Sequence, residues 1–460
     1  MTAQSKRDPL LLGLLAAVFL AAAIGVSRLL GFTGVSPLAS EVIRWIGIGL
    51  LVAYAARERS LTAWILAGMA AGAEIGYDAP TVAVHFQVLG AIFLRLIKVI
   101  IAPLLFGTLV VGIAGHADIK KVGRMGIKAI VYFEVVSTIA IFIGLAAINI
   151  SRAGVGIQMP AGAIENPQGL VPHSAGELIL NAVPENIAKS VAEGQVLQVV
   201  VFSILFGLAL AMVPESKRRP LVAFAESLSE TMFKFTNIVM WAAPIGVFGS
   251  IAYTVGHMGL GILLPLLKLL ATMYVALVAF VSFVLLPIAY LTKVPIARFV
   301  KAIGEPVTIA FATASSEAAL PRAMENMEAL GVPRPTVAFV MPTGYSFNLD
   351  GSSLYQSLAL IFMAQAAGLH LSFAQQIVMM LTLLLSSKGT AGVARASLII
   401  VLATAMQFHL PVEPFFLLFG IDQLMDMPRT AVNVLGNCLA TVVVARWEGE
   451  FPAERTSLSA

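Results

Sequence analysis

Long apolar stretches, separated by short charged turns, dominate the first two thirds of the chain. A helix of about 20 residues at ~1.5 Å per residue crosses a bilayer core of about 30 Å. The pattern predicts membrane helices at residues 10–32, 41–56, 61–77, 89–115, 122–150, 195–212, 233–255 and 260–291. Residues 151–190 are polar and contain Gly and Pro, so we expect an extramembrane segment there with room for one short helix.

The last third of the chain has shorter apolar stretches, which polar and small residues interrupt. Residues 300–313 run into ASSEAALP, and residues 339–369 contain PTGYSFNLDGSS. Residues 371–385 and 393–408 flank SSKGTAG. Each flank of about 15 residues is only ~22 Å long, which is too short for a ~30 Å hydrocarbon core. These lengths predict a re-entrant hairpin whose tip stops inside the membrane, where it lines a cavity or packs against protein.

A hairpin followed by a helix with polar interruptions thus occurs twice, at residues 300–369 and at residues 371–447. Repeated broken segments in corresponding halves of a membrane protein point to a transporter site at the midplane. The ends of broken helices suit such a site, because exposed N–H groups attract carboxylates and exposed carbonyls attract cations.

Residues 414–447 form the most unusual apolar segment, because five polar side chains interrupt it at steps of 4, 3, 4 and 4. On a helix they fall within about 80° of arc. An ionised side chain at the bilayer centre costs roughly 2.5–3.5 kcal/mol, so the stripe must face protein, water or ligand. One interpretation is a structural ion-pair network; the other is a solute site with an arginine for a carboxylate and an aspartate for an ammonium group. The five residues are Asp422, Asp426, Arg429, Asn433 and Asn437.

Composition agrees with a polytopic membrane protein. Of 460 residues, 59% are hydrophobic and 12% are charged, and the mean hydropathy of +0.92 excludes a soluble domain. The net charge of +4 reflects basic cytoplasmic turns and predicts no nucleic-acid partner. Those turns share one side if every predicted span crosses, which places both termini in the cytoplasm. The single cysteine, Cys438, forms no internal disulfide and is expected to fill apolar space.

Five motifs, in order, resemble segments of the dicarboxylate/amino-acid:cation symporters, the glutamate transporter family. The resemblance covers residues 61–449 and is closest to the bacterial proton–glutamate branch. It implies an all-α polytopic fold with two re-entrant hairpins, inverted repeats and elevator-type transport, in a homotrimer in the cell (inner or plasma) membrane. The motifs are IFLRLIKVIIAPLLFGTLVVGIA (92–114), ASSEAALP (314–321), NLDGSSLYQ (348–356), SSKGTAGVARAS (386–397) and GIDQLMDMPRTAVNVLGN (420–437).

The resemblance also implies a division into domains. Residues 1–60 have no counterpart in the usual eight-helix pattern and are expected to form an extra, peripheral helical hairpin. The scaffold and trimerisation domain would comprise residues 61–121 and 160–258, and the transport domain residues 122–159 and 259–449. Within the transport domain we expect hairpin 1 at about 296–333, helix 7 at 335–369, hairpin 2 at 371–409 and helix 8 at 413–447. A cytoplasmic tail would follow at 450–460.

The resemblance assigns the substrate contacts residue by residue. Arg429 matches the arginine that grips the substrate's side-chain carboxylate, and Asp426 the aspartate that holds its ammonium group. C4-dicarboxylate carriers do not keep an acid at this position, so Asp426 favours glutamate or aspartate. The remaining expected contacts are Ser315, Ser316, Ser352, Thr430 and Asn433, with Gly389, Thr390, Ala391, Gly392 and Val393 in the second hairpin.

The coupling ion is where the sequence departs from the family pattern. Sodium-coupled members have an aspartate at the position of Asn437 and oxygen-bearing side chains at those of Phe133 and Val136. A hard cation loses ligands by these changes. A buried carboxyl group can instead carry a proton near neutral pH, so we expect proton coupling. The candidate coupling residues are Glu134, Ser137, Gly344, Ser346, Asn348, Asp350, Asp422 and Asn437.

Three classes of alternative function remain. The first is another symporter of the same family, either sodium-coupled through Asp350, Asn348 and backbone carbonyls near Gly344 and Ser346, or specific for C4-dicarboxylates. The second is an ion channel, against which the amino-acid-shaped charge set argues. The third is an intramembrane enzyme, but the sequence shows no nucleophile–base pair, metal cluster or nucleotide loop. We therefore expect no enzyme activity, no organic cofactor and no certain metal site.

Overall fold

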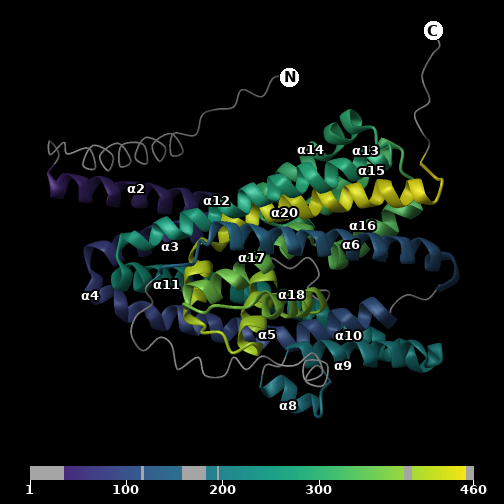
Figure 1. The fold of residues 1–460 in the computed structure, drawn as a ribbon, viewed down its shortest axis with the longest axis horizontal. Helices are drawn as coiled ribbons and strands as arrows, with labels where there is room; N and C mark the ends of the chain where they lie inside the picture. Colours follow the sequence, from purple (N-terminus) through teal and green to yellow (C-terminus); the bar gives the residue numbers. More distant parts are fainter. Residues whose placement is uncertain (1–35, 115–118, 158–182, 194–195, 388–395, 452–460) are drawn as a thin grey trace, which may run out of the picture. The chain divides into compact units, whose positions relative to one another are not determined.

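The computed structural model describes residues 36–114, 119–157, 183–193, 196–387 and 396–451 (Figure 1). These ranges are helical and contain no β-strand, as predicted for an all-α chain. The segment predicted at 10–32 lies outside the described residues. Five described helices are long and apolar enough to cross a membrane: Leu38–Glu58, Pro80–Val111, Met125–Ser151, Leu260–Leu291 and Glu413–Trp447.

The chain packs as two compact units, one made of residues up to 95 with 238–262 and the other of 96–237 with 263–460. In the first unit, α3 (Leu61–Asp78) packs along α11 (Ala243–Met258). The contact is close because α3 carries glycine at every fourth position. A Cβ at Gly68 would lie 2.5 Å from the carbonyl oxygen of Pro244, and one at Gly72 2.5 Å from that of Phe248. Such small-residue stripes let membrane helices approach backbone to backbone.

A further helix of this unit, α2 (Pro37–Glu58), is tied to α3 by polar contacts. Arg44 pairs with Glu74 at 2.5 Å and with Asp78 at 3.0 Å, and the Trp45 indole N–H donates to Asp78 at 3.0 Å. This helix, which lies within the extra segment predicted at residues 1–60, is therefore anchored to α3 by charge pairs as well as by apolar packing. The unit also contains α4 (Pro80–Ala83), η1 (Val84–Phe86), the start of α5 (Gln87–Ala114) and η2 (Leu260–Ile262).

The second unit is built around α20 (Glu413–Trp447), whose side chains are buried almost all the way round. A single amphipathic stripe was expected, but the apolar face is enclosed as well, because helices cover both sides. Figure 1 shows α14 and α15 running alongside α20. The helices packed on α20 are α6 (Ile119–Ser151), α12 (Leu263–Phe280), α14 (Ile296–Thr313), α15 (Ser316–Leu330), α16 (Arg334–Phe347) and α17 (Asp350–Ala366).

The remaining helices of this unit complete its core. The second part of α5 packs with α9 (Val196–Ala211) and α10 (Glu215–Met240) around Val110, Ala114, Leu210 and Ala225. A short helix, α8 (Ile187–Ala192), precedes α9. The π-helical segment η3 (Val281–Leu285) and α13 (Leu286–Leu291) continue α12. Residues 260–291 accordingly form one long apolar segment, as predicted.

The hairpin formed by α14 and α15 has a much shorter tip than the polar motif suggested. Only Ala314 and Ser315 separate the two helices, so most of ASSEAALP is helical, Pro321 included. Ala314 adopts a left-handed conformation with φ of 49°, and the Ser315 hydroxyl accepts a hydrogen bond from the N–H of Ala318 at 3.3 Å. This N-cap starts α15 at once, which explains the short tip.

The interruption between α16 and α17 is likewise narrower than expected. The polar motif at 342–353 predicted a longer break, but only Asn348 and Leu349 are non-helical. Pro342 lies inside α16. The side chain of Asp350 therefore stands at the first turn of a half-helix, close to non-helical backbone.

The prediction of a single helix at residues 233–255 is wrong, because α10 ends at Met240 and α11 begins at Ala243. Pro244 fits this break, since proline has no N–H to donate to the Met240 carbonyl four residues earlier and is favoured in the first turn of a new helix. The segments predicted as the short flanks of a second hairpin are the helices α18 (Phe373–Ser387) and α19 (Ala396–Gln407), both shorter than a full membrane span.

Candidate substrate site

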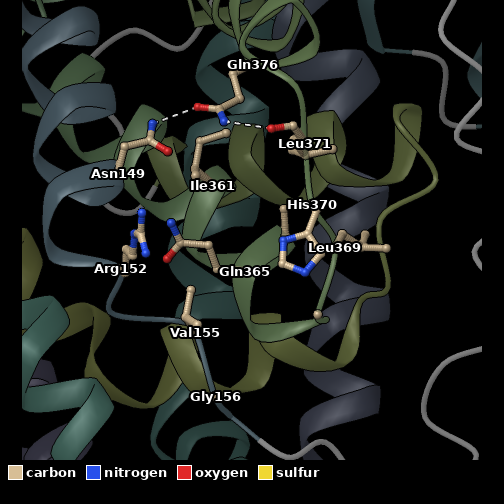
Figure 2. A pocket seen from close by; sticks show the side chains of 12 residues that line it. Asn149, Arg152, Val155, Gly156, Ile361, Gln365, Leu369, His370, Leu371 and Gln376 are labelled. Carbon is tan, nitrogen blue, oxygen red and sulfur yellow. Dashed lines mark hydrogen bonds between the residues drawn. The ribbon is translucent and has the colours of Figure 1, made fainter.

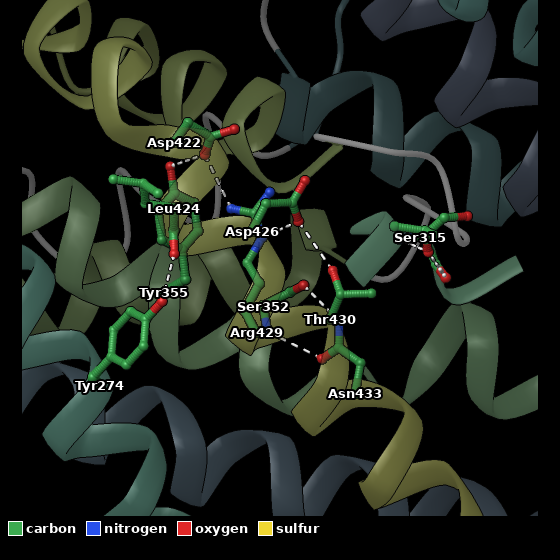
Figure 3. A network of polar contacts seen from close by, with 11 residues as sticks. Tyr274, Ser315, Ser352, Tyr355, Asp422, Leu424, Asp426, Arg429, Thr430 and Asn433 are labelled. Carbon is green, nitrogen blue, oxygen red and sulfur yellow. Dashed lines mark hydrogen bonds and ion pairs between the residues drawn. The ribbon is translucent and has the colours of Figure 1, made fainter. Parts of the chain in front are cut away.

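Arg429 is the centre of the polar stripe on α20. Its side chain is almost completely buried, at 2% exposure. Its Nε donates to Asp426 Oδ1 at 2.8 Å and its Nη1 to Asp422 Oδ1 at 3.3 Å (Figure 3). The two acids lie three and seven residues before Arg429, so successive helical turns bring all three groups to one side. The ion-pair interpretation of the stripe is therefore realised in this arrangement.

Two neutral side chains complete what we call the arginine cluster: Tyr355, Asp422, Asp426, Arg429 and Thr430. The Tyr355 hydroxyl donates to Asp422 Oδ1 at 2.9 Å, and the Thr430 hydroxyl to Asp426 Oδ1 at 3.1 Å. The guanidinium carbon of Arg429 lies 4.2 Å from the centroid of the Tyr355 ring. Each charge in this enclosed cluster thus has both an opposite charge and a neutral hydroxyl or aromatic neighbour, which offsets the cost of its burial.

Ser352 and Asn433 join α17 to α20 beside this cluster. The Asn433 amide N–H donates to the Ser352 hydroxyl at 3.0 Å, and its oxygen accepts from the Ser352 backbone N–H at 3.2 Å. Both side chains are buried. The structure brings together all four predicted α20 substrate residues with Ser352 (Figure 3).

A second buried group, which we call the amide cluster, contains Ser137, Asn348, Asp350 and Asn437. The Ser137 hydroxyl donates to Asp350 Oδ1 at 3.3 Å, and the Asn348 amide N–H donates to Asn437 Oδ1 at 3.1 Å. Ser137, Asn348 and Asp350 are completely buried, and Asn437 is nearly so. Among the described residues, Asn348 Oδ1 has no hydrogen-bond partner. The cluster therefore offers one carboxylate and an amide oxygen available to a proton, a water molecule or a cation.

Glycines allow the broken helix to approach α20 at both clusters. A Cβ at Gly351 would overlap the backbone carbonyl oxygen of Arg429. A Cβ at Gly344 would overlap Asn437 Oδ1. The close contact between α17 and the backbone of Arg429 thus depends on the absence of a side chain at residue 351.

The first hairpin contributes its serines differently. The Ser315 hydroxyl caps α15, and Figure 3 shows Ser315 apart from Arg429. Ser316 is buried at the start of α15. The side chain of Ser346 lies outside the described residues. So do the predicted substrate contacts of the second hairpin, which are Gly389, Thr390, Ala391, Gly392 and Val393.

The three candidate coupling carboxylates differ in burial. Asp350 and Asp422 are completely buried, whereas Glu134 on α6 is only half-buried. Glu134 is a candidate because a buried carboxyl group can carry a proton, and its half-buried position meets this condition less well than the positions of the two aspartates. Asp422 is ion-paired with Arg429, whereas Asp350 accepts a hydrogen bond from the neutral Ser137.

Tyr355 has no role among the residues predicted from the sequence, although it lies in the motif NLDGSSLYQ. A signal was present, because residues 352 and 355 are three apart and therefore share a helix face. Within the described residues there is no group of three or more His, Cys, Asp or Glu side chains that could hold a metal ion. The two clusters supply a guanidinium group, carboxylates, hydroxyls and side-chain amides.

Comparison with known proteins decides the family. The profile of the sodium:dicarboxylate symporter family matches residues 61–447. The chain belongs to this family. It is therefore a multi-pass membrane protein of a transporter family, and the resemblance inferred from its motifs is confirmed.

Curated relatives in this symporter family align over most of their length. A proton/sodium-glutamate symport protein of Bacillus caldotenax is 43% identical over 404 residues, 85% of this chain and 96% of the relative. A proton/glutamate-aspartate symporter of Escherichia coli (strain K12) is 44% identical over 375 residues, 80% and 86% of the two chains. A C4-dicarboxylate transport protein of Solibacter usitatus (strain Ellin6076) is 42% identical over 399 residues, 85% and 93%.

Proposed function

We propose that this protein is a symporter that imports acidic amino acids, L-glutamate or L-aspartate, together with protons. The observation that carries the proposal is the pairing of Arg429 with Asp426 at 2.8 Å in the buried stripe of α20. An arginine fork suits bidentate binding of a carboxylate, and an aspartate suits an ammonium group. A single helix face thus offers complementary charges for both ends of an acidic amino acid.

The ion pairs within the arginine cluster describe the substrate-free arrangement in this proposal. A substrate carboxylate would take over guanidinium N–H groups that now bind the two aspartates, and its ammonium group would bind Asp426. Tyr355 supports this exchange, because a ring stacked on the guanidinium and a hydroxyl bonded to Asp422 keep both groups in position. Asp426 would exchange its arginine partner for the ammonium group, and Asp422 would retain the Tyr355 hydroxyl as a hydrogen-bond donor.

For coupling we propose that Asp350 carries the proton. Its complete burial and its neutral hydroxyl partner, Ser137, suit a carboxyl group that is protonated in part of the cycle. Asn437 adds an amide instead of a second carboxylate to the amide cluster. A sodium ion is the alternative, favoured by the buried and unpartnered Asn348 Oδ1 among the described residues.

For the transport cycle we propose an elevator in a homotrimer of the cell (inner or plasma) membrane, with both termini in the cytoplasm. Residues 122–159 and 259–449 would move, while residues 61–121 and 160–258 would form the static scaffold. The short helices α18 and α19 support a re-entrant hairpin 2 that acts as the lid, since neither is long enough to cross a bilayer. The compact hairpin of α14 and α15 would be its counterpart.

The substrate class is tested by competition in proteoliposomes that contain the purified protein. We expect saturable uptake of radiolabelled L-glutamate, inhibited by L-aspartate far more strongly than by succinate. External glutamate should also accelerate release of internal label, which a carrier does and a channel does not. Equal inhibition by succinate would contradict the assignment of Asp426 to an ammonium group and would favour a C4-dicarboxylate carrier.

A further inference from the structure

The second unit contains a cavity of about 560 Å³ that lies at the ends of α6 and α17 and at the start of α18 (Figure 2). Its polar lining residues are Asn149, Arg152, Gln365, His370 and Gln376. No member of the arginine cluster or of the amide cluster lines it. The cavity is therefore separate from the proposed transport site.

The charge of the cavity has one sign. Among the described residues, Arg152 and His370 are the only ionisable groups that line it, and no carboxylate does. Figure 2 shows the two side chains on different walls, with Gln365 between them. Within the part of the chain that the structure describes, neither side chain takes part in an ion pair. An exposed guanidinium and an imidazole thus present N–H donors to the same space.

The walls are held in place by amide hydrogen bonds. The Asn149 amide N–H donates to Gln376 Oε1 at 2.7 Å, and the Gln376 amide N–H donates to the carbonyl of Leu371 at 3.1 Å. Gln365 accepts from the N–H of Gly154 at 3.1 Å. These contacts join α6, α17 and α18, so the amide side chains of the lining are held in place before any ligand binds.

A simpler role for Arg152 is to complement the negative end of α6, where it follows the last helical residue. The backbone reduces the need for this role. The Ile148 carbonyl already accepts from the Arg152 backbone N–H at 2.8 Å and from the Gln365 amide at 3.3 Å. At the end of α17, the Ala364 carbonyl accepts from Leu369 at 2.9 Å. The guanidinium N–H groups are therefore left for a group that enters the cavity.

We propose that this cavity is a second anion site, which binds a carboxylate or phosphate group through Arg152 and His370. A planar guanidinium binds two oxygens of such a group at once, and an imidazole N–H supplies a donor from the opposite wall. The Asn149–Gln376 bond in the cavity lining joins α6 to α18, the first helix of the predicted second hairpin. An anion bound here contacts both elements and so biases the position of that hairpin.

The test uses purified full-length protein and radiolabelled inorganic phosphate in equilibrium dialysis at low ionic strength. We expect the wild-type protein to bind phosphate saturably. The dissociation constant should rise at least tenfold in Arg152→Gln and in His370→Gln, about the effect of losing one hydrogen-bonded charge pair. Arg152→Lys should keep partial binding and shows that the fold tolerates substitution there. Arg334→Gln is the matched charge control, since its side chain is 86% exposed, and it should bind as the wild type does.

Arg429→Gln separates this site from the transport site and should leave phosphate binding unchanged. Nanodiscs separate the sources of the anion: phosphatidylglycerol that blocks phosphate binding, where phosphatidylcholine does not, identifies a lipid headgroup, and equal binding in both identifies a free anion. Binding that survives in Arg152→Gln, or that is lost equally in Arg429→Gln, overturns the proposal. So does the absence of both saturable phosphate binding and Arg152-dependent retention of phosphatidylglycerol.

Discussion

The guanidinium carbon of Arg429 lies 4.2 Å from the centre of the Tyr355 ring. The two residues are on different helices, and the tyrosine hydroxyl also bonds Asp422, a second partner of the same arginine. The ring and the hydroxyl thus act on one cation in two ways, directly through the π face and indirectly through the carboxylate. Tyr355 thus helps to fix where the Arg429 side chain lies.

Removing the Tyr355 hydroxyl should leave a buried carboxylate with one donor fewer. We expect Tyr355→Phe to lower stability by about 1–3 kcal/mol. Tyr355→Leu should lower it by a further ~0.5–2 kcal/mol, because the ring beneath the cation is lost as well. Thermal denaturation in detergent measures both changes. Tyr132→Phe is the matched control: that buried hydroxyl has no partner among the described residues, so its removal should cost nothing. Equal losses at both positions would refute the role of the hydroxyl.

Neutralising Asp426 should change the selectivity of transport. The amide of Asp426→Asn can still accept hydrogen bonds from Arg429 and Thr430, but it no longer attracts an ammonium group. We expect the KM for glutamate to rise at least tenfold, by about 1.5–3 kcal/mol for a charged hydrogen bond, while succinate transport is retained or gained. The ratio of glutamate to succinate uptake in proteoliposomes measures this. Glu325→Gln, an exposed neutralisation, should leave the ratio unchanged. An unaltered ratio in Asp426→Asn would contradict the ammonium assignment.

Asp350 should matter for net transport and not for exchange. If it carries the proton, Asp350→Asn should lower uptake driven by a pH gradient at least tenfold, since the loaded carrier can no longer change its protonation state. Exchange of internal for external glutamate needs no net proton movement and should persist. Glu134→Gln, the half-buried alternative on α6, should change pH-driven uptake less than twofold. The reverse order of the two variants would assign the proton to Glu134.

Gly351 tests how closely the half-helix approaches the arginine cluster. A methyl group there would overlap the carbonyl oxygen of Arg429, and backbone cannot move away cheaply. We expect Gly351→Ala to lower stability by about 1–3 kcal/mol and to reduce glutamate uptake. At Gly304 in α14 nothing lies within 4 Å of an added Cβ, so Gly304→Ala should be neutral or stabilise by about 0.5–1 kcal/mol. Thermal stability of the two variants compares them directly. Similar effects would mean that the close contact is not rigid.

The sequence predicted much of this architecture because bilayer thickness constrains helix length and hydropathy. The polar stripe of α20 was predicted from spacing alone, and the structure gathers Asp422, Asp426, Arg429 and Asn433 where that spacing places them. Burial of the opposite face was not predictable from local pattern, because apolar residues read the same toward lipid as toward neighbouring helices. Tertiary contacts from α12, α14 and α17 decide it.

Local backbone details were harder to predict. The tip at Ala314 and Ser315 depends on one capping hydroxyl and one left-handed residue, whereas a run of small polar residues suggested a loop. The break before Ala243 required weighing Pro244 against an otherwise continuous apolar segment. Tyr355 was missed because its role depends on a partner helix almost seventy residues away.

The central claim is that protons drive uptake of an acidic amino acid. The direct measurement is uptake of radiolabelled L-glutamate into proteoliposomes under an imposed pH gradient without sodium, and then under a sodium gradient at equal pH. We expect accumulation with the pH gradient alone and none with the sodium gradient alone. Accumulation that requires sodium would contradict it, and would mean that Asn348, Asp350 and Asn437 form a working sodium site despite the missing carboxylate.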